Sequence, residues 1–273
     1  MIVQTAADSA AHFVTKMKEH GDFAGRLARA FGNAEFGSIE PRNLALYAID
    51  HHDYGWIEFD DRPERDSATG LPYNIVGTPR RITLQTLNLS PDFNERYHPY
   101  CGLLVTMHMY GVYTGRYGLS DRVLIDRMQG EARAEFEAAL QGLSERQMRL
   151  KARVAADPAT VALVADDGPL MQNYKQLQFF DQLALYFNYT PPTDRKPAKY
   201  RGVPRSAEED VTVKVAPINE TIYAFDPFPF SEEGIEVYCE GRYILPVEGD
   251  NKDLAEALDS APTARQTMRF VSG

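Results

Sequence analysis

The stretch AIDHHDYGW, residues 48–56, collects ionisable side chains where the surrounding sequence predicts the end of a buried helix. Two histidines and two aspartates occupy positions 50–53, and Gly55 is typical of a helix end. The helix is predicted to have Ser38 as its N-cap and to stop at Gly55. Ionised groups are costly to remove from water unless they are paired. The stretch therefore predicts a functional site at the end of a helix.

The composition of the chain limits the classes of function. With 273 residues, the chain can bury a large core. Its formal net charge of −10 argues against a nucleic-acid partner, because phosphate backbones bind basic surfaces. No apolar run approaches the roughly 18 residues of a membrane span, and two cysteines are too few for a disulfide framework. We therefore expect a cytoplasmic protein without a membrane or nucleic-acid partner, and the sequence leaves a homo-oligomer open.

The hydrophobic pattern predicts a mainly α fold over residues 1–190. Between two of the predicted helices, residues 57–97 are expected to form a long polar loop that covers the mouth of the site as a mobile lid. Apolar residues at helical spacing predict helices at 10–31, 38–55, 99–113, 121–155 and 169–188.

The pattern changes after residue 190. Residues 191–204 are rich in proline and basic residues, and we expect a linker there. Beyond it, β-branched and aromatic residues predict strands. The predicted architecture is a helical metal-binding domain over 1–190 with a small antiparallel β-rich region over 205–273 packed against it. The strands are expected at 211–215, 221–225, 234–246 and 267–271, with a helix at 251–259.

Ionisable residues lie on the apolar stripes of four predicted helices. They are His20, the pair His52 and Asp53, His108, and Asp181. Asp181 lies between two leucines on its stripe, and an unpaired buried carboxylate costs on the order of several kcal/mol. A shared metal ion would balance the charge; the alternative is a metal-free cluster of buried ion pairs. Consecutive helical residues diverge by about 100°, so His52 and Asp53 can bind one ion only near a helix end.

This order of residues resembles the HD-domain superfamily, which is named for its His-Asp doublet and includes many metal-dependent phosphohydrolases. Four longer segments look like an uncharacterised bacterial family of HD-like proteins, a domain of unknown function. These segments are EHGDFAGRLARAFG (19–32), HHDYGWIEFDDRP (51–63), LLVTMHMYGVYTG (103–115) and QLQFFDQLALYF (176–187).

The resemblance implies an HD-domain-like helical bundle with a divalent metal ion. Mn, Fe, Mg, Zn, Co and Ni all suit its mixed nitrogen and oxygen ligands. Two-metal HD enzymes have a further pair of histidines, whereas the matching interval here contains His98 in a predicted loop and His108 on a helix. One metal ion with His108 beside it is therefore expected. The implied ligands are His20, His52, Asp53 and Asp181.

Several residues are assigned to catalysis or substrate binding. Asp53 is expected to orient or deprotonate a bound water, and His108 or His51 to protonate the leaving group. His108 could instead be a hydrogen-bonded core residue. The two aromatic substrate candidates could equally belong to the core, and the arginine to a solvated loop. The candidate substrate-binding residues are Tyr54, Trp56, Arg65 and Gln178.

The predicted site favours a metal-dependent hydrolase of a small phosphate ester or a nucleotide-like substrate. The acidic net charge does not exclude a phosphorylated small molecule, because a bound metal supplies local positive charge. Two alternatives stay open. One is an HD-like di-iron oxygenase, which would need additional histidines. The other is a non-catalytic, ligand-binding or regulatory HD-like module.

Overall fold

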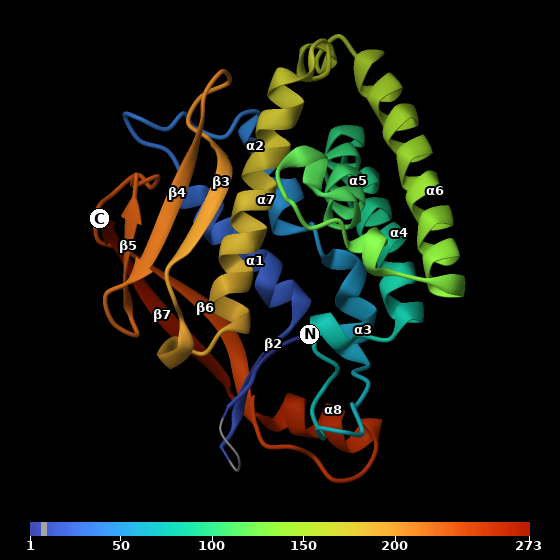
Figure 1. The fold of residues 1–273 in the computed structure, drawn as a ribbon, viewed down its shortest axis with the longest axis vertical. Helices are drawn as coiled ribbons and strands as arrows, with labels where there is room; N and C mark the ends of the chain where they lie inside the picture. Colours follow the sequence, from blue (N-terminus) through green and yellow to red (C-terminus); the bar gives the residue numbers. More distant parts are fainter. Residues whose placement is uncertain (7–9) are drawn as a thin grey trace.

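The fold consists of a curled sheet on one side and helices on the other (Figure 1). The computed structural model describes residues 1–6 and 10–273, of which about 52% are helical and 19% are in strands. The described strands are β1 (Ile2–Gln4), β2 (His12–Thr15), β3 (Ala198–Pro204), β4 (Asp210–Pro217), β5 (Ile222–Asp226), β6 (Ile235–Ile244) and β7 (Thr263–Ser272). The described α-helices are α1 (Met17–Ala30), α2 (Arg42–Asp50), α3 (Ile57–Asp61), α4 (Arg80–Tyr97), α5 (Pro99–Thr114), α6 (Gly130–Ala155), α7 (Asp167–Tyr189) and α8 (Asn251–Ser260).

The sheet joins the two ends of the chain. Its strand order is β1-β2-β6-β7-β5-β4-β3, so the short N-terminal strands continue into the C-terminal ones through β6. In that pairing His12 lies opposite Ile244. The paired strands are antiparallel except for β5 and β7, which are parallel. The prediction of a mainly α bundle with a small antiparallel C-terminal region is therefore wrong, because strands from both ends form one large sheet.

The sequence did not predict β1 and β2 because their residues are buried on both faces of the sheet. All four residues of β2 are buried, so the segment lacks the alternation of polar and apolar residues that marks a half-exposed strand. Phe13 also continues the helical spacing of α1, which begins only at Met17. The β-branched Val14 and Thr15 favour an extended backbone, and pairing with β1 and β6 fixes it.

The segment predicted to be a linker, residues 191–204, contributes a strand to the sheet. Its second half forms β3, which pairs with β4 and packs against α7. Tyr200 of β3 meets Phe179 of α7 edge to face, with ring centroids 5.5 Å apart. Most of the proline and basic residues that suggested a linker precede β3. Within β3 itself, too few residues alternate between buried and exposed to indicate a strand.

The segment predicted to be a long loop, residues 57–97, is largely helical. It contains α3 and the whole of α4, which packs against α5. Pro91 inside α4 interrupted the sequence signal of that helix. The remaining part, residues 62–79, is bonded to the segment before α8, where Arg65 Nε donates to the Val247 carbonyl at 2.7 Å. The expectation of a mobile lid of 41 residues is wrong in its extent, because most of this segment is helical.

The structure confirms the type of each remaining predicted element, helix or strand, but several of them begin or end at other residues. α5 and α7 match the predicted helices within two residues, whereas the predicted helix at 121–155 begins only at Gly130. The helix predicted at 38–55 is limited to α2 and stops at Asp50. The strands β4 to β7 and the helix α8 lie where their β-branched and apolar patterns indicated. No helix within the described residues combines the length and apolar character needed to cross a bilayer.

Two central helices, α1 and α7, lie between the sheet and the outer helices (Figure 1). α1 packs on α7, α2 and β6, and α7 also packs on β1 and β3. Phe23 of α1 meets Phe187 of α7 edge to face at 6.1 Å, and Phe187 stacks on Phe270 of β7 at 5.5 Å. Full burial of each such ring contributes about 2–3 kcal/mol. This apolar layer fixes the two helices that carry His20 and Asp181.

Candidate metal centre

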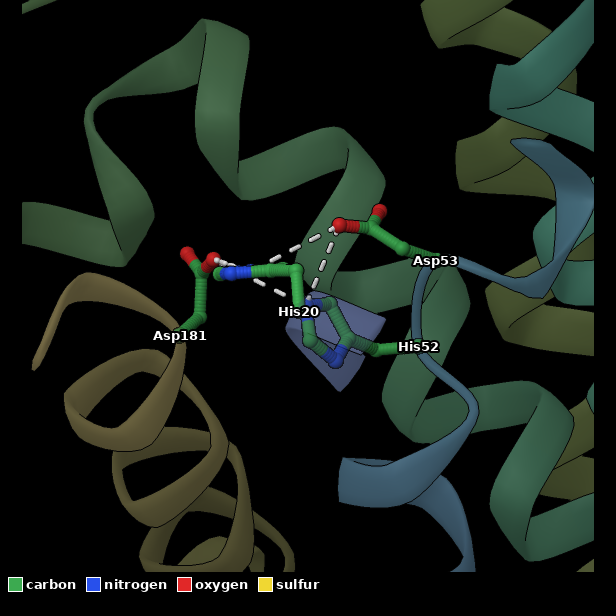
Figure 2. A group of neighbouring side chains, drawn as sticks. All are labelled: His20, His52, Asp53 and Asp181. Atoms are coloured by element: carbon green, nitrogen blue, oxygen red, sulfur yellow. Dashed lines mark hydrogen bonds and ion pairs between the residues drawn. The ribbon is translucent and has the colours of Figure 1, made fainter. Parts of the chain in front are cut away.

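Four buried side chains converge between α1, the end of α2 and α7 (Figure 2). Each offers one nitrogen or oxygen atom, and these four atoms all lie within 4.8 Å of one another. The side chains belong to residues that are at most 6% exposed. Within the described residues they form the one group of three or more potential metal ligands. The four residues are His20, His52, Asp53 and Asp181, the set predicted from the sequence.

A close approach of α1 and α2 brings the two histidines together. Gly21 follows His20 in α1, and a Cβ atom at Gly21 would lie 2.5 Å from the carbonyl oxygen of Asp50. Only glycine therefore allows the last residue of α2 to come so near to α1. His52 follows two residues after Asp50, and its ring lies 5.4 Å from the ring of His20.

The Nδ1 atoms of His20 and His52 each donate a hydrogen bond to a carbonyl oxygen. His52 Nδ1 donates to the Ile49 carbonyl at 2.7 Å, and His20 Nδ1 donates to Asn188 Oδ1 at 2.9 Å. Metal-binding histidines typically donate their second ring N–H in this way, which fixes the tautomer and the ring orientation. Both Nε2 atoms consequently face the two carboxylates, as they would around a shared cation.

The distances within the group match ligand–ligand spacings better than hydrogen bonds. The Nε2 atom of His20 lies 3.3 Å from Asp181 and 3.8 Å from Asp53, and that of His52 lies 3.3 Å from Asp53 and 3.6 Å from Asp181. Charge-assisted hydrogen bonds are about 2.7–2.9 Å long. Atoms bound tetrahedrally at about 2.1 Å from one ion are about 3.4 Å apart. His52 Nε2 makes no hydrogen bond with any described residue.

Electrostatics couple the four residues. Burial alone would lower the pKa of His52, but Asp53 and Asp181 raise it well above its usual value. Burial would likewise raise the pKa of Asp181, but His20 and His52 hold it well below the usual value. Asp53 has a lowered pKa for the same reason, mainly because of His52. Both carboxylates are therefore ionised at neutral pH, and their negative charge faces the two imidazole rings. The group could hold a metal ion.

His108 lies beside this group and is held by Gln178. The Gln178 amide nitrogen donates to His108 Nδ1 at 2.6 Å, and the ring of His108 meets that of His52 edge to face at 5.1 Å. Burial lowers the pKa of His108 to about 4, so it is neutral at pH 7. With Nδ1 accepting a hydrogen bond, the proton of the neutral ring lies on Nε2. Gln178, which the sequence placed among the candidate substrate-binding residues, thus orients His108.

His51 and Tyr54 belong to an aromatic group beside the four residues. The His51 ring stacks on Tyr47 at 4.0 Å and lies 4.3 Å from Tyr54, and its Nδ1 donates to the Tyr47 carbonyl at 2.7 Å. The Tyr54 hydroxyl donates to Asp22 at 3.3 Å. The structure therefore places both side chains among aromatic and surface partners and outside the converging group.

The other two substrate-binding candidates also lie apart from the group. Trp56 is buried in an apolar cluster with Met17 and Ile82. Arg65 is bonded to the first residue of α8, because its backbone N–H donates to Asn251 Oδ1 at 2.8 Å. Trp56 is thus a core residue, and Arg65 belongs to the connection between α3 and α4.

Sequence reasoning missed Asn188, the partner of His20. Asn188 lies seven residues after Asp181 in α7, which is two helical turns, so both side chains lie on the same face. This spacing of seven residues was the sequence signal that could have identified Asn188. An asparagine near a helix end is more often a capping residue, and only the position of α1 shows that its amide oxygen meets a histidine.

Comparison with known proteins corrects the expected family. The family model that matches this chain is not one of the HD-domain superfamily, and the seven-stranded sheet does not fit an HD-like helical bundle. The resemblance rested on the order of a few ligands and on short segments, which different folds can share. Curated proteins and solved structures yielded no match. The matching model covers residues 1–245, and the chain therefore belongs to the family described as Protein of unknown function (DUF3891).

Proposed function

We propose that the protein binds one divalent transition-metal ion through His20, His52, Asp53 and Asp181, and that it is a metal-dependent hydrolase of a small phosphate ester. The ring of four nitrogen–oxygen distances between 3.3 and 3.8 Å carries this proposal. Those distances are too long for strong ion pairs and close to the edges of a coordination polyhedron.

The charge of the group favours a divalent cation over a proton. Protonation of His52 alone would leave two carboxylates facing one positive charge in a site removed from water. A divalent ion balances both carboxylates, and burying an unbalanced charge is costly. Two imidazole ligands suit Mn, Fe, Co, Ni and Zn, whereas Mg prefers oxygen ligands throughout.

The residues around the site suit hydrolysis. A divalent ion held by these four residues would supply a water of lowered pKa and would polarise a phosphoryl oxygen. Asp53 would hold the ion with one carboxylate oxygen and would orient that water with the other. His108 is neutral at pH 7, so it acts as a hydrogen-bond donor through Nε2–H to a phosphoryl or leaving oxygen and is a poor proton source.

The placement of His98 favours one metal ion over two. His98 is the N-cap of α5, where its Nδ1 accepts a hydrogen bond from the backbone N–H of Tyr100 at 3.1 Å. It lies outside the converging group, which is the one such group within the described residues. A chemistry that needs two ions and extra histidines has no support from this arrangement.

The test is hydrolysis of p-nitrophenyl phosphate and bis-p-nitrophenyl phosphate by protein supplied with Mn²⁺, Co²⁺ or Zn²⁺. We expect turnover of at least one ester that His52→Gln abolishes and that His12→Gln retains. His12 is a buried histidine of β2 that contacts the Ala6 backbone, outside the group. Turnover that His52→Gln retains, or metal binding by the wild-type protein with no turnover of either ester, would contradict a metal-dependent hydrolase.

A further inference from the structure

The turn that carries His52 and Asp53 lies against α4. It follows the end of α2 and leads into a short 3-10 helix, η1 (Tyr54–Trp56), against which α4 packs. A Cβ atom at Gly55 would lie 2.3 Å from the backbone nitrogen of Ser90 in α4. Glycine at position 55 therefore allows this close approach of the turn to the helix.

Two buried side chains of α4 bond to the backbone of the turn. Asn94 Nδ2 donates to the carbonyl oxygen of His51 at 2.8 Å, and it also donates to the Ser90 carbonyl of its own helix at 3.0 Å. Ser90 Oγ accepts a hydrogen bond from the backbone N–H of Gly55 at 3.0 Å. Both side chains belong to residues that are 0% exposed, and four positions separate them, so they share one face of α4. One bond to the turn precedes the two ligands in the chain and the other follows them.

Serine and asparagine are poor choices for the buried face of a helix. Their side chains compete for backbone hydrogen bonds, which lowers helix propensity. Asn94 also leaves its Oδ1 atom buried without a hydrogen-bond partner among the described residues, and an unpaired buried acceptor is destabilising. Departures from local sequence preferences are expected at functional sites. The helix gains little from these two residues, whereas the turn gains a donor and an acceptor.

We propose that Ser90 and Asn94 are positioning residues of the candidate metal centre, which hold the turn so that its two ligands point toward one ion. The inference rests on the proposed function for the identity of those ligands. A binding site must hold its ligands within about 0.5 Å of the productive geometry. Because His52 and Asp53 are neighbours in the chain, their convergence depends on the backbone angles of the turn, which are −108° and 16° at Asp53. Ser90 and Asn94 fix those angles through the backbone groups on either side of the ligands.

Titration of metal-free protein with Co²⁺ tests this positioning. Asn94→Ala and Ser90→Ala should each bind Co²⁺ about 10- to 100-fold more weakly than wild type, as for other residues that orient metal ligands. Thr86→Ala is the matched control. Thr86 is a buried residue on the same face of α4, and its hydroxyl donates to the Thr83 carbonyl of the same helix at 2.9 Å. The control should bind Co²⁺ as tightly as wild type.

The absorption spectrum of bound Co²⁺ separates positioning from a general loss of stability. The directions of the ligands determine the Co²⁺ bands, so Asn94→Ala should shift them. Asn173→Ala removes a buried asparagine of α7 whose bonds lie outside the turn, and its bands should stay in place even where its melting temperature falls. Asn94→Ala should fold, because the His51 carbonyl keeps the N–H of Tyr54 as a donor at 3.1 Å. Ser90→Ala carries the same comparison.

A measurement without metal distinguishes failure of this inference from failure of the proposed function. The ring centroids of His52 and His108 lie 5.1 Å apart, so the nuclear Overhauser effect between their protons reports the direction of the His52 ring in metal-free protein. The effect should weaken in the double variant Ser90→Ala/Asn94→Ala and persist in Thr86→Ala. An unchanged effect in the double variant, or Co²⁺ affinity and bands that equal those of wild type in both single variants, would overturn the inference. Wild-type protein that binds no Co²⁺ would contradict the proposed function, and the Overhauser effect would then decide the inference.

Discussion

The Nε2 atom of His52 lies 3.3 Å from a carboxylate oxygen of Asp53, the next residue in the chain. Adjacent side chains of a helix could not meet in this way, because they diverge by about 100°. The chain leaves α2 at Asp50, and the backbone at Asp53 has φ −108° and ψ 16°, between helix and strand. The end of the helix therefore turns the side chains of His52 and Asp53 toward one point. The sequence predicted that these two residues could share an ion only at such a position.

The crossing of α1 and α2 depends on Gly21. Gly21→Ala would place a Cβ atom 2.5 Å from the backbone of Asp50, so α2 must move away and the two histidines must separate. We expect the free energy of unfolding to fall by about 1–3 kcal/mol and metal affinity to fall as well. Urea unfolding and metal titration measure both.

Gly142→Ala is the matched control for Gly21→Ala. Gly142 is an exposed residue inside α6 with no atom near the position of a Cβ. Alanine there should stabilise the protein by about 0.5–1 kcal/mol through helix propensity. A stabilising effect of both substitutions would show that the close approach of the two helices does not constrain position 21.

The partner of His20 should influence the metal without binding it. In Asn188→Ala, His20 Nδ1 loses the amide oxygen that it bonds at 2.9 Å, and the ring becomes free to rotate. Metal affinity should fall by about 10- to 100-fold. Asn173→Ala removes another buried asparagine of α7, which bonds Tyr100 and Gln176. That control should lose stability and keep its metal affinity; an equal loss of affinity would point to a general effect of unfolding.

Asp60 should make stability depend on pH in a direction opposite to that of most carboxylates. It is buried, which raises its pKa to about 6 from 3.8, and its carboxylate accepts a hydrogen bond from the Lys18 backbone N–H at 3.2 Å. Because the folded pKa exceeds the unfolded one, stability from this group is greatest below pH 4 and falls as the pH rises through 6.

Asp60→Asn keeps the acceptor oxygen and removes the buried charge. At pH 7 we expect the variant to be more stable than wild type by about 1–3 kcal/mol, and near pH 4 the difference should vanish. Asp61→Asn, at the exposed neighbouring position, should change stability little at either pH. Urea unfolding between pH 4 and pH 8 supplies the comparison, and a variant that is less stable at pH 7 would contradict the burial argument.

The left-handed turn after α5 should be strained. Arg116→Gly relieves a positive φ of 53°, so the free energy of unfolding should rise by about 1 kcal/mol. Arg122→Gly, at a position without positive φ, should lower it by up to about 1 kcal/mol. Thermal unfolding of both variants tests the strain, and a loss of stability at position 116 would mean that the arginine side chain supports the fold.

The candidate site could be predicted from the sequence because burial of charge is visible there. Asp181 lies between leucines on one stripe of a helix, and that pattern alone demands a cation nearby. His20 and the His52–Asp53 pair follow from the same reasoning. Asn188 gave no such signal, because an asparagine near a helix end looks like a capping residue, and only the position of α1 shows that it bonds His20.

The sheet could not be predicted because its N-terminal strands are short and contact distant partners. β1 has three residues and β2 has four, and all of them are buried, so neither shows a period of two. β2 gains its partner from β6, more than 220 residues later in the chain. Strand pairing over that separation depends on tertiary contacts that local pattern does not encode. The C-terminal strands alternate more clearly and were found.

The most direct test of the central claim is the metal content of the purified protein, measured by elemental analysis without exposure to chelator. Wild type and the exposed control Asp259→Asn should each contain about one divalent transition-metal ion per chain, while Asp181→Asn, which removes one ligand charge with little change in volume, should contain far less. Near-zero metal in all three proteins, with no uptake of added Mn²⁺, Co²⁺ or Zn²⁺ by wild type, would show that His20, His52, Asp53 and Asp181 form a buried ion-pair cluster.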